Sequence, residues 1–263
     1  IHLMAEAMKL AYSDRSRYLG DPDFFDVPAR GLVSKEYAKR LNKKISLRKA
    51  RPSKQIGPGR VPPVESPDTT HLSVMDSAGN AVVLTTTLNF SYGSGIVIRG
   101  TGMLMNNEMA DFSAKAGVPN AFGLLGGEAN QIEPGKRPLS SMAPSMLLRD
   151  GKPYLLTGSP GGSRILTTVL QMIVNVADFE MNVAEATMAP RVHHQWLPDK
   201  LYMEAGFSPD TKRLLQARGQ NVVDSNSMGS LQSILYEEGY FYGASDTRRP
   251  GAAAVAAEAD QRR

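Results

Sequence analysis

A proline-rich tract divides this sequence into two parts that differ in the spacing of their apolar residues. Its five prolines lie between residues 50 and 68, among few apolar residues: Pro52, Pro58, Pro62, Pro63 and Pro67. Proline lacks a backbone N–H and interrupts both helices and central strands, so the tract predicts an extended loop. Apolar residues before it recur at helical spacing, whereas those after it alternate as in strands. We therefore expect two regions, 1–68 and 69–263.

Helices and hairpins are predicted on both sides of this boundary. The helical segments are residues 2–19, 34–41, 163–176, 182–188 and 208–218. Hairpins are predicted around the turns at residues 76–80, 150–151 and 237–239, each flanked by alternating or apolar runs. Hairpins and packing helices in one chain predict an α+β fold in which stacked antiparallel sheets lie between helical layers.

Composition narrows the class of protein. The 263 residues are enough for one large domain or two small ones. The absence of cysteine excludes disulfides, thiolate zinc sites and cysteine nucleophiles. No apolar run reaches the roughly 18–20 residues of a membrane span. The first residues resemble the interior of a helix already under way, so we expect a piece of a longer protein.

Basic side chains gather just before the boundary, with ten between Lys35 and Arg60 against one acidic residue, Glu36. Nucleic-acid binding is one interpretation of such a cluster. No aromatic residue after Tyr37 is interleaved with these charges, and no nucleic-acid motif accompanies them. We favour a solvated surface segment and expect no nucleic-acid partner.

Thr69-Thr70-His71 opens the first strand after the tract. A threonine that becomes the first residue of a chain is nucleophile and base together. Its hydroxyl attacks, and its α-amine, with a reference pKa of about 7.7–8.0, accepts the proton. Threonine pairs are usually structural in strands. Here Thr85-Thr86-Thr87 is expected on the partner strand, where a hydroxyl could bond to Thr69, and alternation puts Asn89 on the face of Thr87. These residues indicate an N-terminal-nucleophile amide hydrolase or acyltransferase, cleaved at Asp68–Thr69.

Gly158-Ser159-Pro160-Gly161-Gly162-Ser163 leads into a predicted helix. Backbone N–H groups of such a turn stabilise an oxyanion. A phosphate cradle is a weaker interpretation, because the segment lacks the Gly-Lys-Ser/Thr ending of a nucleotide loop. A tight connection without chemical function is an equally good interpretation of this segment taken alone.

Two polar pairs are candidate substrate contacts. Glu108 and Asp111 stand three residues apart, so both carboxylates could meet one cation such as an ammonium, although surface charge is the commoner role. Adjacent Ser140 and Ser141 could hold a carboxylate, or simply form a turn. His193-His194 is a weak metal signal, because adjacent side chains diverge on regular structure. We expect no metal and no cofactor.

Five segments together resemble the γ-glutamyltranspeptidases, also called glutathione hydrolases. They are Thr69-Thr70-His71, Asn106-Asn107-Glu108-Met109-Ala110-Asp111-Phe112, Arg137-Pro138-Leu139-Ser140-Ser141-Met142, Gly158-Ser159-Pro160-Gly161-Gly162 and Gly243-Ala244-Ser245-Asp246. The resemblance runs through nearly the whole chain and is most specific from Thr69 onward. It implies an Ntn-hydrolase αββα sandwich made by autocleavage before Thr69.

The resemblance also implies roles for single residues. Thr69 forms the γ-glutamyl-enzyme ester and Thr87 supports it. Backbone N–H groups of Gly161 and Gly162 stabilise the oxyanion. The remaining implied contacts are Asn89, Glu108 and Asp111 for the substrate's α-amino end, Ser140 and Ser141 for its α-carboxylate, and a lid at about residues 117–127 that includes Phe122.

The sequence departs from the family in one respect, the extent of its N-terminal region. Members carry a large N-terminal subunit with an arginine that grips the glutamyl carboxylate, and only its last portion corresponds to residues 1–68. The resemblance therefore implies an incomplete sandwich, partnered by the large subunit of the same precursor, in the periplasm or outside the cell. The expected donor is glutathione-like, and the acceptor is an amino acid, a peptide or water. The alternatives are a cephalosporin-type β-lactam acylase on the same scaffold, and an inactive fragment that packs with a partner chain.

Overall fold

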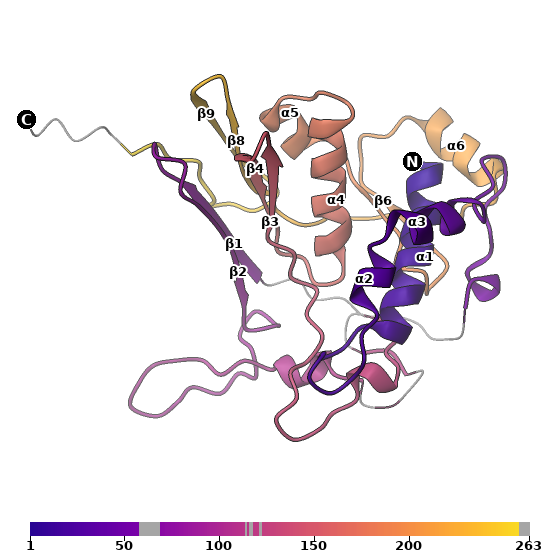
Figure 1. The fold of residues 1–263 in the computed structure, drawn as a ribbon, viewed down its shortest axis with the longest axis horizontal. Coiled ribbons are helices and arrows are strands. Elements are labelled where there is room, and N and C mark those ends of the chain that lie inside the picture. The colour runs from indigo at the N-terminus through magenta and orange to yellow at the C-terminus, as the bar shows by residue number, and fades with distance from the viewer. Residues whose placement is uncertain (58–68, 114, 116–117, 121–122, 258–263) are drawn as a thin grey trace, which may run out of the picture.

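Two antiparallel sheets stack against each other, and a layer of helices covers one of them (Figure 1). The structure is a computed structural model that describes residues 1–57, 69–113, 115, 118–120 and 123–257. The predicted cleavage residue Asp68 and the predicted lid residue Phe122 lie outside the described residues.

The first sheet is a single hairpin of β1 (Thr69–Met75) and β2 (Ala81–Thr87). The second has the order β3-β4-β8-β9 and comprises β3 (Ser145–Arg149), β4 (Lys152–Thr157), β8 (Gln232–Glu237) and β9 (Tyr240–Ser245). Helices α4 (Arg164–Ala177) and α5 (Val183–Met188) lie on the side of this sheet that faces away from β1 and β2 (Figure 1).

All three predicted hairpins are confirmed, and their turns show why they form. Asp76 Oδ1 accepts hydrogen bonds from the backbone N–H groups of Ala78 and Asn80 at 2.9 and 2.8 Å. The other two turns are Asp150-Gly151 and Glu238-Gly239, in which both residues have positive φ. Two such residues make the turn whose twist matches that of paired strands.

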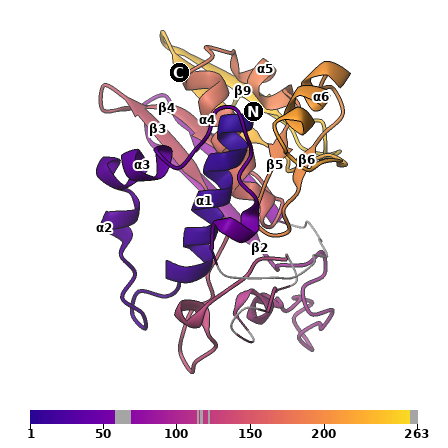
Figure 2. The same cartoon turned by 90° about the vertical axis from the view of Figure 1, so that its right-hand side faces the viewer.

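The remaining elements lie outside the two stacked sheets, and among them β5 contacts α4. They are α1 (His2–Tyr18), α2 (Ala29–Leu32), α3 (Lys35–Asn42), α6 (Pro209–Ala217), the strands β5 (Val192–His193), β6 (Leu201–Met203) and β7 (Val222–Asp224), and three 3-10 turns, η1 (Ser53–Gln55), η2 (Glu108–Asp111) and η3 (Glu128–Asn130). Figure 2 looks onto α1, which lies between α3 and β5. The five predicted helices are confirmed, whereas α2 and the sheet β5-β6-β7 were not predicted.

The largest core lies between the four-stranded sheet and the helices α4 and α5. Leu155 of β4 and Met172 of α4 are completely buried there. Val176 and Leu235 belong to the same cluster and are nearly completely buried. Each such side chain contributes roughly 1.5–3 kcal/mol by leaving water. This core fixes the strand end at Thr157, from which the glycine-rich segment begins.

The hairpin β1–β2 has one polar buried face and one apolar exposed face. Thr69, His71 and Ser73 point toward the four-stranded sheet, and Ser73 Oγ donates to the Gln232 carbonyl at 3.0 Å. On the other face Leu72, Val74, Val82 and Leu84 are 49–58% exposed. The stacked sheets and the α+β class are thus confirmed, with helices over only one of the two sheets in the part of the chain that is described.

Gly158, the residue after β4, lies against the ring of His71 in β1. A Cβ atom added there would lie 2.1 Å from His71 Cε1, far inside van der Waals contact, whereas one added at Gly31 in α2 would meet nothing within 4 Å. We predict that Gly158→Ala lowers the free energy of unfolding by about 1–3 kcal/mol through overpacking. Gly31→Ala is the control and is expected to leave it unchanged or slightly raised. Urea unfolding followed by fluorescence of the single, buried Trp196 measures the stability of both variants. A Gly158→Ala variant as stable as the wild type would contradict the packing described.

Candidate active site

Thr69 begins β1 directly opposite Thr87, the last residue of β2. The side chain of Thr69 is buried, and its Oγ1 donates to Thr87 Oγ1 at 3.2 Å. Arg249 Nη1 donates to the carbonyl of Thr69 at 3.0 Å. The predicted cross-strand pair is therefore present, and the candidate nucleophile is held at both its hydroxyl and its carbonyl.

Asn89 reaches this pair by a different route from the one predicted. Strand β2 ends at Thr87, and Asn89 has a left-handed backbone with φ 72°, so strand alternation does not place its side chain. Its backbone N–H donates to Thr87 Oγ1 at 2.9 Å, and its Nδ2 donates to the Asn107 carbonyl at 3.2 Å. Asn89 therefore links the nucleophile strand to the segment that carries Glu108.

Glu108 and Asp111 form a hydrogen-bonded carboxyl pair within the single turn η2. Burial, followed by the charge of Asp111, raises the pKa of Glu108 to about 7. Burial also raises the pKa of Asp111, against the opposing effects of the Glu108 hydrogen bond and the Arg15 charge. Glu108 Oε1 is buried with no hydrogen-bond partner among the described residues. An ammonium group would supply the missing donor and the missing positive charge.

Ser141 lies close to this pair through a residue that the sequence did not single out. Arg15 Nη2 of α1 donates to Ser141 Oγ at 2.9 Å, and the Arg15 charge acts on Asp111. Ser140 is exposed, and its Oγ accepts the N–H of Met142 at 3.0 Å. Ser141, rather than Ser140, is therefore tied to the carboxyl pair.

Asn130 is a second residue that the sequence did not single out. Its Nδ2 donates to the Asp111 carbonyl at 2.8 Å, and its Oδ1 accepts the N–H of Leu139 at 2.9 Å. This buried amide therefore joins the carboxyl segment to the serine segment.

The sequence does contain a signal for Arg15. Met8, Tyr12 and Arg15 recur at helical spacing on one buried stripe of α1, and a cation is exceptional in such a stripe.

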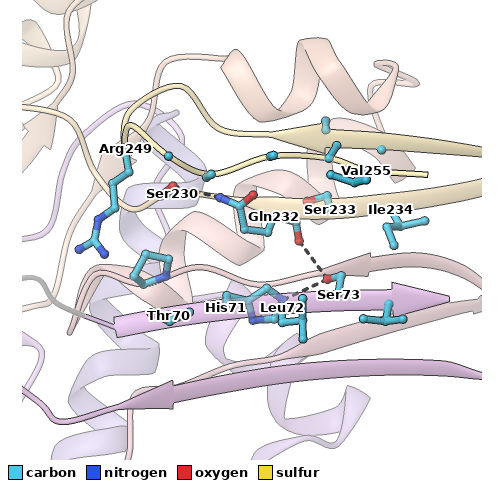
Figure 3. A pocket seen from close by; sticks show the side chains of 18 of the residues that line it. Thr70, His71, Leu72, Ser73, Ser230, Gln232, Ser233, Ile234, Arg249 and Val255 are labelled. Carbon is cyan, nitrogen blue, oxygen red and sulfur yellow. Dashed lines mark hydrogen bonds between the residues drawn. The ribbon is translucent and has the colours of Figure 1, made fainter. Parts of the chain in front are cut away.

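The glycine-rich turn lies on the other side of Thr69. Gly161 and Gly162 have φ of 134° and 53°, conformations that favour glycine, and α4 begins two residues later. The turn is anchored by Ser159 Oγ, which accepts the N–H of Ser230 at 2.8 Å. Figure 3 shows part of a cleft of about 630 Å³ between β1 and the segment around Ser230 and Gln232. Thr69 and Pro160, the residue before Gly161, also line this cleft. This placement suits a turn that receives an oxyanion formed at Thr69.

The histidines play structural parts in this arrangement. Burial lowers the pKa of His71 to about 4, so its ring is neutral at pH 7. Its Nδ1 and Nε2 lie 2.8 and 3.1 Å from Thr85 Oγ1 and Ser73 Oγ. Burial likewise lowers the pKa of His193, to about 3, and its ring nitrogens contact Thr167 and Gln195. Both ring nitrogens of His71 are occupied by hydroxyl groups, and its lowered pKa makes the ring a weak base, so we assign it no proton transfer at Thr69.

The pattern of the gamma-glutamyltranspeptidase family matches residues 1–256. The chain belongs to this family. It is 59% identical to the glutathione hydrolase proenzyme of Escherichia coli over 94% of its length, and 45% identical to that of Pseudomonas sp. over 95%. These alignments cover 43% and 45% of the two relatives, so the chain spans about half their length.

Solved structures agree with this assignment. The T380A mutant of Helicobacter pylori γ-glutamyltranspeptidase matches 68% of the chain and 100% of its own with 52% identity and a TM-score of 0.67. Cephalosporin acylase from Bacillus halodurans matches 97% of the chain and 45% of its own with 26% identity and a TM-score of 0.79. The Ntn-hydrolase fold is thus confirmed. Among the described residues, no helix has the length and apolar character needed to cross a membrane.

The raised pKa of Glu108 predicts a pH-dependent stability difference. Its folded-state pKa of about 7 exceeds the model-compound value of 4.5, so stabilisation by the neutral form is lost as the pH rises from 4.5 through 7. Glu108→Gln removes this loss. We expect it to be more stable than the wild type at pH 8 by about 1 kcal/mol, solvent screening included, and to gain nothing at pH 4. Urea unfolding of the wild type and of Glu108→Gln at pH 4 and pH 8 tests this difference, with Glu36→Gln on α3 as the surface control. A stability gain of Glu108→Gln that is the same at pH 4 and pH 8 would contradict the prediction.

Proposed function

We propose that the protein containing this chain transfers or hydrolyses γ-glutamyl groups through an ester on Thr69. Thr69 Oγ1 attacks the γ-carbonyl carbon, and the Thr69 α-amine takes the hydroxyl proton. The N–H groups of Gly161 and Gly162 receive the oxyanion. The amide C–N bond then breaks and the amine leaves with the proton. Water or an amine acceptor next attacks the ester carbonyl and gives its proton to the α-amine. The ester C–O bond breaks, Thr69 Oγ1 takes that proton back, and glutamate or the new γ-glutamyl amide leaves. The observation that carries this proposal is the pairing of Thr69 with Thr87, with Thr69 lining a cleft that is also lined by Pro160, the residue before Gly161.

The two ends of the glutamyl head group match the two polar clusters. Glu108, Asp111 and Asn89 would bind the α-ammonium, since Glu108 lacks a partner at Oε1 among the described residues. Ser140 and Ser141 would bind the α-carboxylate, and Arg15 behind Ser141 supplies positive charge. A ligand that carries both charges on one carbon fits this pattern.

Self-cleavage between Asp68 and Thr69 is part of the proposal, because it creates the α-amine that the mechanism requires. The names of the relatives, glutathione hydrolase proenzymes, support it. We further propose that the large subunit of the same precursor covers the exposed apolar face of β1–β2, formed by Leu72, Val74, Val82 and Leu84. We also propose, from the family resemblance, that the protein works in the periplasm or outside the cell.

Thr69→Ala tests the nucleophile. We predict a single uncleaved chain by intact-mass spectrometry and a loss of γ-glutamyl turnover of more than about a thousandfold, because both nucleophile and base chemistry depend on this residue. The neighbouring Thr70→Ala is the control; that residue is exposed, and cleavage is expected to proceed. Cleavage at the same bond in Thr69→Ala would refute the assignment of the nucleophile.

Cephalosporin acylase activity is the second candidate, favoured by the structural match to the Bacillus halodurans enzyme over 97% of the chain. The carboxyl pair argues for the first candidate, because a glutaryl group lacks the ammonium that this pair suits. We predict that kcat/KM for γ-glutamyl-p-nitroanilide exceeds that for glutaryl-p-nitroanilide by at least about tenfold, the value of one ion pair. A preference for the glutaryl anilide, accompanied by turnover of a glutaryl cephalosporin, would reverse the order of the two candidates.

A further inference from the structure

Helix α1 contacts two separate parts of the candidate site from behind. Arg15 donates to Ser141 in the serine segment, and one turn earlier Tyr12 OH donates to the carbonyl of Ser163, at the end of the glycine turn. Residues three apart lie on the same face of a helix. One helix face therefore touches both the proposed carboxylate pocket and the turn proposed to receive the oxyanion.

We propose that Arg15 is a positioning residue that sets Ser141 for binding the substrate's α-carboxylate, an inference that rests on the proposed function. Ser141 Oγ accepts a hydrogen bond from Arg15 Nη2 at 2.9 Å. A hydroxyl has a single proton, and an acceptor contact from behind leaves that proton free to point elsewhere. Arg15 therefore orients Ser141 as a donor toward an anion, without touching the substrate itself.

The setting of Arg15 supports a fixed orientation. The residue is only 9% exposed, and the small enclosed space beside it is bordered by Asp111 and Asn130. The Arg15 charge opposes the rise in the pKa of Asp111, so the guanidinium acts on both polar clusters. A buried cation that donates to a serine and acts on a nearby aspartate has little freedom to reorient, and the geometry of Ser141 is correspondingly restricted.

A purely structural part for Arg15 makes a different prediction from a positioning part. If Arg15 only stabilises the fold, its loss weakens turnover of every donor alike. If it sets Ser141, the loss falls on donors that carry the α-carboxylate. The 4-aminobutanoyl group retains the ammonium of the γ-glutamyl group and lacks the carboxylate, so it separates the two cases.

The experiment compares γ-glutamyl-p-nitroanilide with 4-aminobutanoyl-p-nitroanilide in the whole gene product that contains this chain. For Arg15→Met we expect kcat/KM for the γ-glutamyl donor to fall about tenfold to a hundredfold, mostly through KM, as for a lost charge-assisted contact. For the 4-aminobutanoyl donor we expect a change of less than about threefold, because Arg15 acts on Asp111 only through its charge and hydrogen-bonds to Ser141 directly. Arg15→Lys should recover part of the loss, since the lysine keeps the charge but lacks the planar fork.

Arg17→Met is the matched control, because Arg17 lies on the same helix and is exposed; it should leave both donors unchanged. An equal loss on both donors, or no loss on either, would overturn the inference. A double-mutant cycle of Arg15→Met and Ser141→Ala on thermal unfolding adds a readout independent of turnover. Failure of the proposed function shows as a wild type inactive on the γ-glutamyl donor. In that case unfolding temperatures that add independently overturn the Arg15–Ser141 coupling as well, and non-additive temperatures support it.

Discussion

The buried ammonium of Lys9 is the contact on which the placement of α1 depends. Lys9 is 1% exposed, and its Nζ donates to Glu6 Oε1 at 2.9 Å and to the Arg51 carbonyl at 3.0 Å, with Asp199 Oδ1 at 3.7 Å. A buried charge without its partners costs roughly 3–5 kcal/mol. Lys9 therefore joins α1 to the start of the proline-rich tract and to the segment after β5. Tyr12 and Arg15 lie one and two turns further along the same helix, so their positions follow from this joint.

Elements with local signals were predictable from the sequence, and elements set by distant pairing were not. Ser34, Asn182 and Ser208 each accept a backbone N–H from the third residue beyond, as helix-capping residues do. Strands β5, β6 and β7 have only two or three residues each, and β6 pairs with β7 in parallel across α6. Two or three residues give no measurable alternation, so only the tertiary packing defines these strands.

The same division holds within the site. A hairpin turn fixes the register of its strands, so the Thr69–Thr87 pair follows from the turn at residues 76–80. The side-chain direction of Asn89 was not predictable in this way, because its left-handed backbone ends the strand alternation. Arg15 lies 126 positions from Ser141, and no local pattern connects a helix to a loop that far along the chain. The sequence does show Arg15 as a cation on an apolar helix stripe. Such a cation indicates that a buried polar partner exists, but the sequence does not say which residue that partner is.

The two regions on either side of the predicted cleavage point are held together by contacts that a broken peptide bond leaves intact. Ala5 of α1 packs with Val192 and Leu201, and Asp21 accepts hydrogen bonds from the backbone and side chain of Arg137. Those hydrogen bonds keep the pKa of the Asp21 carboxyl well below its usual range. The Thr69–Thr87 pair, the carboxyl pair and the glycine turn are accordingly built from contacts that do not involve the Asp68–Thr69 bond. Cleavage would then change the chemistry at one atom, by turning the Thr69 amide nitrogen into an amine, within a site whose geometry already exists.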